Sequence, residues 1–431
     1  IPNNQITIRN NTIKNCPSGG PFFYFKFSNK IDDFTFESCN FIENKINNYI
    51  DYNVQSQITP QVWVENSQNG NYRSKFKLIF DDCYFKKDTS PTKGGAINYG
   101  KGNPFVNTRV VFRECQFIEN EATNGGSAIS IETYQGCEIN DCKFIKNKSN
   151  EGFGTVHIKT QFSLSESREE EVLITSSTFE ENGCKESHAI HVIETDMKIH
   201  ISKCTFNDCG ANDYIISIKS KPQLIIFENN TLQYTKSGDT TACAICFHTE
   251  NFNLIGNTFN NFKNTVVRFY SQPSDDKQFQ IIENLFSQCS GDSIIDAENQ
   301  VKICPKITGN TFKDISVISN LLSFKLNNNI GQLAFDNNTF LNFKINTNFG
   351  GIGLDINHES NDISFLLSFN DCFFININNL EKQQQGGAIS CSNAINRGNV
   401  ELSITDCFFS QNHNEGKGCA IYVNIQHSVT I

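Results

Sequence analysis

A three-residue motif recurs about every 27 residues along this 431-residue chain, and this period restricts its fold more than any other feature. Each copy begins with Cys, Asn or Ser, and its third residue is usually Phe, as in Cys39–Phe41 and Asn257–Phe259. We count fourteen copies, separated by 26 to 44 residues. A fixed period of about 20–50 residues is typical of solenoid proteins.

Two positions of the motif define columns of residues. The first position, called the anchor, is Cys in seven copies: Cys39, Cys83, Cys115, Cys142, Cys204, Cys372 and Cys407. The third position is Phe in twelve copies: Phe41, Phe85, Phe117, Phe144, Phe179, Phe206, Phe259, Phe286, Phe312, Phe340, Phe374 and Phe409. Because a solenoid places equivalent residues above one another, we expect the Phe rings to stack in the core. We expect the anchor cysteines to be buried free thiols, and inward Asn residues to bond from coil to coil.

Short runs of β-branched and aromatic residues, such as Lys75–Phe80 and Arg109–Phe112, predict strands. Three such strands in 27 residues make one coil of a parallel β-helix. We therefore predict an all-β, single-stranded, right-handed parallel β-helix of about fourteen coils. It forms one continuous domain over 1–431, expected to be a fragment of a longer chain. A second column, Gly-Gly-Ala-Ile at 94–97 and 386–389, predicts a sharp corner where a side chain would clash.

Composition excludes several classes of protein. Aromatic residues make up 12% of the chain, which argues for a packed interior rather than disorder. The net charge of −10, without a basic cluster, argues against a nucleic-acid partner. The chain has no apolar run of 18 residues, so we predict no membrane span in this segment.

The longest insertion into the repeat, 50–76, is predicted to be a loop. Insertions on one face of a solenoid often form its binding face. Aromatic and arginine side chains contribute most to binding energy in many interfaces, so Tyr52, Trp63, Tyr72 and Arg73 are candidate binding residues. The alternative for Trp63 is that it pins the loop to the β-helix.

The acidic pairs and the metal-like spacings are weak candidates for chemistry. The acids at Asp32-Asp33, Asp81-Asp82, Asp275-Asp276, 169–171 and Asp213 do not recur on adjacent coils at one register beside His or Arg. In His188-x-x-His191 and Cys243-x-x-Cys246 the paired residues face opposite sides of a strand, which disfavours a shared metal. We predict no catalytic residue, no metal and no cofactor.

Cysteines and sequons suggest two covalent modifications. With 17 cysteines, an odd number, those outside the columns are able to form a few disulfides in an oxidising compartment. Four Asn-x-Ser/Thr sequons mark Asn10, Asn147, Asn229 and Asn337 as candidate N-glycosylation sites. Asn147 also ends a Phe-x-x-Asn motif, so we expect it to face inward.

Gly-Gly-Ala-Ile, together with Phe-x-x-Asn at 41–44, 117–120, 144–147, 179–182 and 409–412, resembles the passenger region of chlamydial polymorphic outer membrane proteins and related repeat surface proteins of protists. The resemblance implies a secreted or surface-displayed rod with an adhesive or structural role. Its partner would be a host-cell or matrix protein, a glycan, or further copies of itself. Two alternatives stay open: a subunit that stacks into filaments through uncapped ends, and a polysaccharide lyase or hydrolase.

Overall fold

The computed structural model describes residues 5–18, 23–27, 33–46, 62–66, 75–99, 107–133, 135–149, 153–160, 171–184, 189–210, 214–220, 222–235, 243–249, 251–270, 279–301, 306–318, 321–326, 332–345, 364–379, 387–392, 399–416, 418–424 and 429–430. The chain divides into two compact units, Ile1–Gln223 and Leu224–Ile431. The described residues contain strands and turns but no helix. They therefore include no helix long and apolar enough to cross a membrane.

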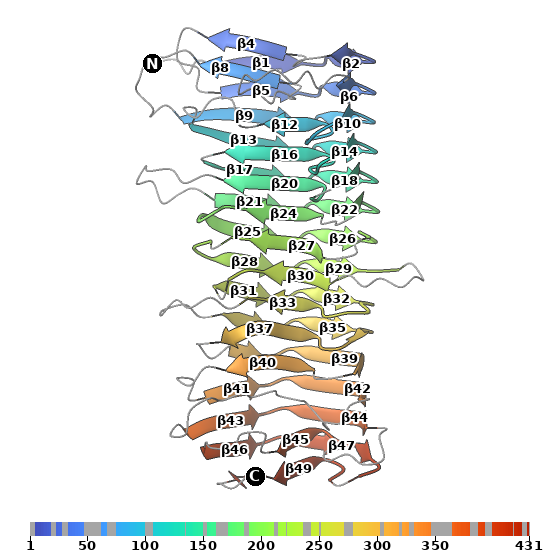
Figure 1. Ribbon diagram of the computed structural model, residues 1–431, viewed down its shortest axis with the longest axis vertical. Coiled ribbons are helices and arrows are strands. Elements are labelled where there is room, and N and C mark those ends of the chain that lie inside the picture. The colour runs from blue at the N-terminus through green and yellow to red at the C-terminus, as the bar shows by residue number, and fades with distance from the viewer. Residues whose placement is uncertain are drawn as a thin grey trace. The chain divides into compact units, whose positions relative to one another are not determined.

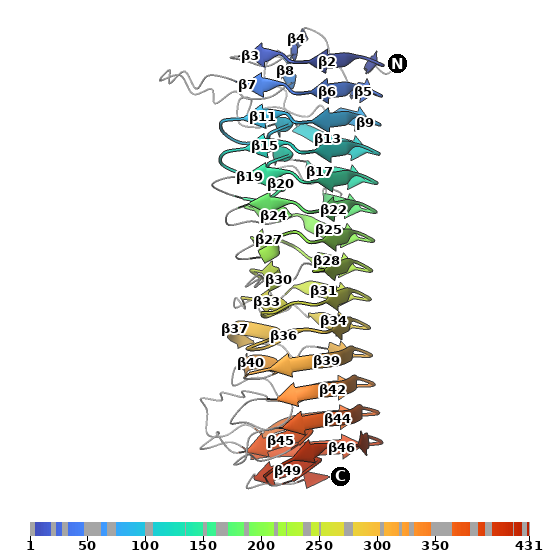
Figure 2. The ribbon, with the colours of Figure 1, turned by 90° about the vertical axis from the view of Figure 1, so that its right-hand side faces the viewer.

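The first unit contains four stacks of parallel strands, called sheets 1 to 4 (Figures 1 and 2). Sheet 1 consists of β1 (Gln5–Arg9), β5 (Asp33–Glu37), β9 (Lys75–Asp81), β13 (Asn107–Arg113), β17 (Gly136–Asn140), β21 (Glu171–Thr175) and β25 (Lys198–Ser202). Sheet 2 consists of β2 (Thr12–Lys14), β6 (Asn40–Ile42), β10 (Tyr84–Lys86), β14 (Gln116–Ile118), β18 (Lys143–Ile145), β22 (Thr178–Glu180) and β26 (Thr205–Asn207). Sheet 3 consists of β3 (Pro17–Ser18), β7 (Lys45–Ile46), β11 (Thr89–Ser90), β15 (Glu121–Ala122), β19 (Lys148–Ser149) and β23 (Gly183–Cys184). Sheet 4 consists of β12 (Ile97–Tyr99), β16 (Ile129–Thr133), β20 (Val156–Thr160), β24 (Ile190–Ile193) and β27 (Tyr214–Lys219), and β4 (Phe23–Phe27) pairs with β8 (Val62–Asn66).

The second unit repeats sheets 1, 2 and 4. Its sheet 1 consists of β28 (Ile225–Glu228), β31 (Phe252–Ile255), β34 (Gln280–Ile282), β38 (Lys306–Thr308), β41 (Gln332–Asp336), β43 (Ser364–Asn370), β46 (Asn399–Thr405) and β50 (Val429–Thr430). Sheet 2 consists of β29 (Thr231–Gln233), β32 (Thr258–Asn260), β35 (Leu285–Ser287), β39 (Thr311–Val317), β42 (Thr339–Ile345), β44 (Phe373–Asn379) and β47 (Phe408–Ser410), with β36 (Ser290–Gly291) on β39 and β48 (His413–Asn414) on β44. Sheet 4 consists of β30 (Cys243–Phe247), β33 (Val267–Phe269), β37 (Ile295–Val301) and β40 (Leu322–Leu326), and β45 (Ile389–Ser392) pairs with β49 (Ile421–Asn424).

Within each unit the chain visits the sheets in the same order on every coil, and each strand pairs in parallel with its equivalent one coil on. In sheet 1, for example, Phe80 lies opposite Phe112, and in sheet 2 Phe85 lies opposite Phe117. The predicted parallel β-helix is therefore confirmed. The continuous domain over 1–431 and the number of coils stay predictions.

The Phe column stacks in the core as predicted. Eleven of its twelve side chains are fully buried, and only Phe409 is half-exposed. Successive rings lie nearly parallel, with centroids 4.6 Å apart for Phe144–Phe179 and 5.3 Å apart for Phe312–Phe340. A second inward column from sheet 1, which includes Phe80, packs edge-on against the first at 5.8 Å from Phe85. Both packing geometries are the ones that aromatic rings prefer.

A left-handed residue turns the chain at the corner between sheets 1 and 2. The residue before the anchor has φ of 49° at Ser38, 47° at Asp82 and 55° at Asn229. This conformation is unfavourable for most residues and least so for Asn, Asp and Gly, which occupy nine of these fourteen corner positions. Residues that adopt a left-handed conformation readily are therefore favoured at this corner.

The corner between sheets 2 and 3 carries alternating charges. Glu43, Lys87, Glu119, Lys146 and Glu181 follow one another at this position, all with φ near +50° to +55°. Lys87 Nζ lies 3.8 Å from Glu119, and Lys146 Nζ lies 3.4 Å from Glu181. Because in-register stacking sets each side chain over its equivalent, the alternation avoids like charges on neighbouring coils.

The Gly-Gly-Ala corner behaves as the sequence predicts at Gly94, where φ is +66° and a Cβ would lie 2.2 Å from the Ile97 carbonyl oxygen. The repeat at Gly387 would place a Cβ even closer, 1.6 Å from the Cys419 carbonyl oxygen. Only glycine allows the chain to turn this closely into sheet 4.

The predicted loop at 50–76 is corrected in its middle. Val62–Asn66 forms strand β8 and pairs in parallel with β4, so that Trp63 lies opposite Tyr24. Alternating Val62 and Val64 fit a strand of the repeat rather than an insertion. The flanking residues up to 74 lie outside the described part of the chain.

Candidate functional site

The predicted binding residues are only partly described. Trp63 belongs to β8, and its backbone takes part in the pairing with β4. Tyr52, Tyr72 and Arg73 lie outside the described residues. The structure therefore places Trp63 in the repeat and leaves the other three as predictions.

Where the anchor is Asn or Ser, the anchor column forms a hydrogen-bonded ladder beside the core. In the second unit the backbone N–H of Asn230 donates to Asn257 Oδ1 at 2.9 Å, and Asn257 and Asn284 repeat this bond one coil on. In the first unit Cys142 N–H donates to Ser177 Oγ at 3.1 Å. The ladder satisfies the N–H group that the left-handed corner leaves outside the strand pairing.

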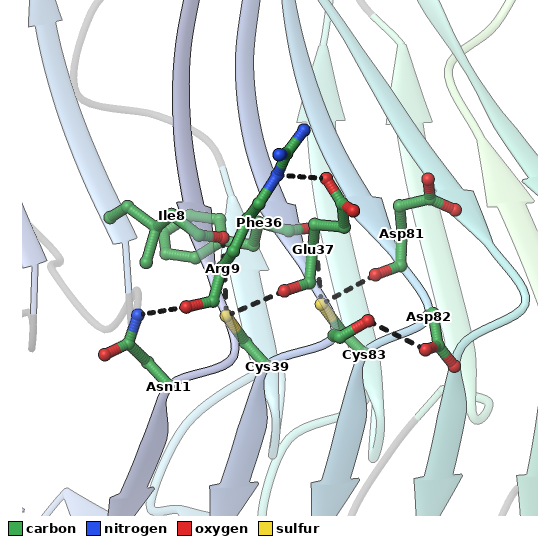
Figure 3. A network of polar contacts seen from close by, with 10 residues as sticks. Ile8, Arg9, Asn11, Phe36, Glu37, Cys39, Asp81, Asp82 and Cys83 are labelled. Carbon is green, nitrogen blue, oxygen red and sulfur yellow. Dashed lines mark hydrogen bonds and ion pairs between the residues drawn. The ribbon is translucent and has the colours of Figure 1, made fainter.

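Cysteine and asparagine share this column because they donate to the same two carbonyl groups. Cys83 Sγ donates to the oxygens of Asp81, two residues earlier, and Phe36, one coil earlier (Figure 3). Asn284 Nδ2 donates to Ile282 and Leu254 at equivalent positions. The exchange of the two residue types along the column thus follows from one bonding pattern.

Most thiols of the described residues are buried, as expected for the anchors. Of the fourteen cysteines whose side chains are described, eleven are buried, Cys16 and Cys407 are half-exposed, and Cys419 is exposed. Burial raises the pKa of Cys204 and of Cys289 to about 12, since an apolar environment disfavours the thiolate. A hydrogen bond with the Cys372 side chain lowers the pKa of Cys407 to about 7.

The exposed and the buried thiols are predicted to differ sharply in their rate of alkylation. Iodoacetamide at pH 8 is expected to modify Cys407 and Cys419 in the native protein, because the thiolate is the nucleophile and both sulfurs reach solvent. Cys204 and the other buried anchors are expected to react at least 100-fold more slowly until the chain unfolds. Peptide mass spectrometry over time measures both rates, and rapid native labelling of most anchors would contradict the buried ladder.

The raised thiol pKa values also predict a loss of stability in alkali. Below about pH 7.5 the buried thiols are protonated in both the folded and the unfolded chain, so their contribution to stability is constant. Between about pH 9 and 12 only the unfolded chain ionises, and the free energy of unfolding is expected to fall. Urea unfolding at several pH values across this range measures how steeply the free energy of unfolding falls with pH. Cys204→Ser, which introduces the residue already present at Ser177, should make this fall less steep.

A second ladder runs along the corner between sheets 2 and 3 and confirms the predicted bonding of inward Asn residues. Asn120 N–H donates to Asn147 Oδ1, and Asn147 N–H donates to Asn182 Oδ1, both at 3.0 Å. The side-chain amide of each also donates to the next Oδ1 at 3.0 Å. All three Asn side chains are buried.

Asp88 occupies one position of this second ladder. Its Oδ1 accepts the N–H of Asn44 at 2.9 Å, and its own N–H donates to Asn120 Oδ1 at 3.0 Å. The side chain is fully buried. The Asp88 side chain has no amide N–H group to donate to a backbone carbonyl. Asn120, by contrast, donates from Nδ2 to the Phe85 carbonyl oxygen.

Asp88→Asn is therefore predicted to raise the free energy of unfolding by about 1–3 kcal/mol at pH 7, because it restores the amide donor and removes a buried acid. Urea unfolding monitored by circular dichroism measures the change. Asp314→Asn, at an exposed corner, is a control expected to change stability by less than about 0.5 kcal/mol. Lower stability in Asp88→Asn would show that the carboxyl group supports the ladder.

Two histidines 34 residues apart in sequence meet on sheet 4. His157 Nδ1 and His191 Nδ1 lie 3.0 Å apart, so the protonated nitrogen of one ring donates a hydrogen bond to the unprotonated nitrogen of the other. Phe153 stacks on the His191 ring at 4.5 Å, and both imidazoles are buried. Within the described residues no three His, Cys, Asp or Glu side chains gather as metal ligands. His188 lies outside the described part, whereas Cys243 and Cys246 are both buried in β30.

The acidic candidates are dispersed over the outside of the β-helix. Asp33 accepts a bond from Gln5, Asp82 accepts one from Ser38, and Glu171 pairs with Lys198. Asp32, Asp213, Asp275-Asp276 and 169–170 lie outside the described residues. Sequence inspection missed that Asp82, Glu114 and Asp141 follow one another at the corner between sheets 1 and 2, where all three are exposed.

Comparison with known proteins gave no matching family model, no similar curated protein and no similar solved structure. The resemblance to polymorphic outer membrane proteins is therefore carried by the sequence motifs alone.

Proposed function

We propose that this chain is a non-enzymatic, secreted or surface-displayed β-helical scaffold with an adhesive or structural role. The observation that supports this best is that its repeated polar residues bond one coil to the next. In the two ladders the side chains of Asn147 and Asn257 are occupied by bonds between coils, which stiffen the backbone. Such a scaffold presents its outward side chains and connecting segments to a partner.

The partner is proposed to be a protein or glycan of a cell surface or matrix, contacted through the residues around β8. This part of the proposal rests on the aromatic and arginine side chains between Ile50 and Phe76 and on the resemblance of the motifs to adhesive surface proteins. It assigns no catalytic residue and no cofactor.

The test is a binding screen of the purified chain on arrays of glycans and matrix proteins at physiological salt. We expect saturable binding to one class of ligand, weakened at least 10-fold by Tyr72→Ala together with Arg73→Ala. Lys143→Ala, on the outer face of sheet 2, is the matched control. Binding to no array member, or product release from an acidic polysaccharide, would overturn the proposal.

A further inference from the structure

We propose that Asn10, Asn229 and Asn337 are N-glycan attachment sites and that Asn147, the fourth sequon residue, is not. The inference rests on the extracellular location in the proposed function. The sequence suggests only that Asn147 faces inward. The structure adds that the other three sequons share one exposed corner.

Three sequons occupy one structural position, the left-handed corner between sheets 1 and 2. Asn10, Asn229 and Asn337 have φ of 55°, 55° and 54°, and each is exposed. The residue after each is an anchor Asn, and the hydroxyl residue that completes the sequon starts a strand of sheet 2. These hydroxyl residues, Thr12, Thr231 and Thr339, all retain access to solvent.

The side chains at this corner are available for modification. Asn10, Asn229 and Asn337 make no side-chain hydrogen bond to another described residue, so a substituent on Nδ2 displaces none of these bonds. Gly256 follows Asn229 one coil on, and a Cβ there would lie 2.7 Å from Asn229 Oδ1. The glycine leaves the room that a side chain would take beside the Asn229 amide.

Asn147 differs in every one of these respects. Its side chain is fully buried, and Nδ2 donates to the Phe117 carbonyl oxygen at 2.9 Å and to Asn182 Oδ1 at 3.0 Å. Ser149, the hydroxyl residue of this sequon, is also buried and donates to the Thr123 carbonyl oxygen. A glycan on Nδ2 would remove both donors from the ladder and has no space in the core.

Transfer of a glycan to these Asn side chains requires a lipid-linked diphosphate oligosaccharide as the donor. The Asn Nδ2 forms a bond to C1 of the first sugar, the bond from C1 to the diphosphate oxygen breaks, and one Nδ2 proton is lost to base. Because transfer precedes folding, chains modified at Asn147 would fail to fold, and the secreted protein would carry glycans at the corner only.

The experiment is secretion of the full chain from eukaryotic cells behind a cleavable signal, followed by glycopeptide mass spectrometry of the folded fraction. We expect occupancy at Asn10, Asn229 and Asn337. Asn→Asp at each should remove one glycan while keeping a residue that tolerates the left-handed corner, so the thermal midpoint of the enzymatically deglycosylated protein should stay unchanged. A glycan on Asn147 in folded protein, or an unmodified residue among the other three, would overturn the inference. This readout needs no ligand, so its failure is separate from a failure of the binding screen.

Discussion

Phe144→Ala is expected to lower the free energy of unfolding of the first unit by about 3–5 kcal/mol, the usual loss for a buried phenylalanine. The ring lies between Phe117 and Phe179, with centroids 4.9 Å and 4.6 Å away, so its removal interrupts the stack on both sides. Since each coil contacts only its neighbours, the cavity also weakens coupling between the coils above and below. Urea unfolding monitored by circular dichroism measures the change in midpoint and in cooperativity.

The matched control for Phe144→Ala is Lys143→Ala, one residue earlier on the exposed side of β18. This change removes no core contact and is expected to alter stability by less than about 0.5 kcal/mol. Phe144→Leu retains an apolar side chain and should fall between the two. A loss below about 1 kcal/mol in Phe144→Ala would mean that neighbouring coils collapse into the space.

The Phe ladder was predictable because one residue type repeats at one period, and a column needs nothing else to be recognised. The second aromatic column was not predicted, because the same position is Phe at 36, 80 and 112 but Ile at 139, 174 and 201, so that no single residue type marks it. Which rings meet edge-on depends on the angle between sheets 1 and 2. The left-handed residue at the corner between these sheets sets that angle, and the sequence does not show it directly.

The corners themselves were only partly visible in the sequence. Asn229 and Asp82 are ordinary residues for a left-handed turn, but Lys87 and Glu119 are not, and their φ values near +55° are imposed by the strands on either side. Strand β8 was missed because its sequence, Val-Trp-Val-Glu-Asn, does not alternate between apolar and polar residues. His157 and His191 meet only because the register of β20 and β24 sets them side by side.

Asn147→Leu, which keeps the branched shape of the side chain, is expected to lower the free energy of unfolding by about 3–5 kcal/mol. Leucine leaves the buried N–H and Nδ2 of Asn120 without their acceptor and removes the donor to the Phe117 carbonyl oxygen. Each buried polar group left unpaired costs about 1–3 kcal/mol. The greater hydrophobicity of leucine offsets only part of this loss.

Asn147→Cys separates hydrogen bonding from burial in the same position. Cysteine occupies this column at Cys209, where Sγ donates to the Phe179 carbonyl oxygen at 3.5 Å. The variant keeps a donor but offers Asn120 only a weak acceptor, so it is expected to lose about 1–3 kcal/mol, less than Asn147→Leu. Equilibrium unfolding of both variants under reducing conditions gives the comparison. If leucine is tolerated as well as cysteine, the column is held by packing alone. If cysteine is clearly favoured over leucine, the column requires a side chain that donates to the carbonyl group one coil earlier, which explains why both Asn and Cys occur in it.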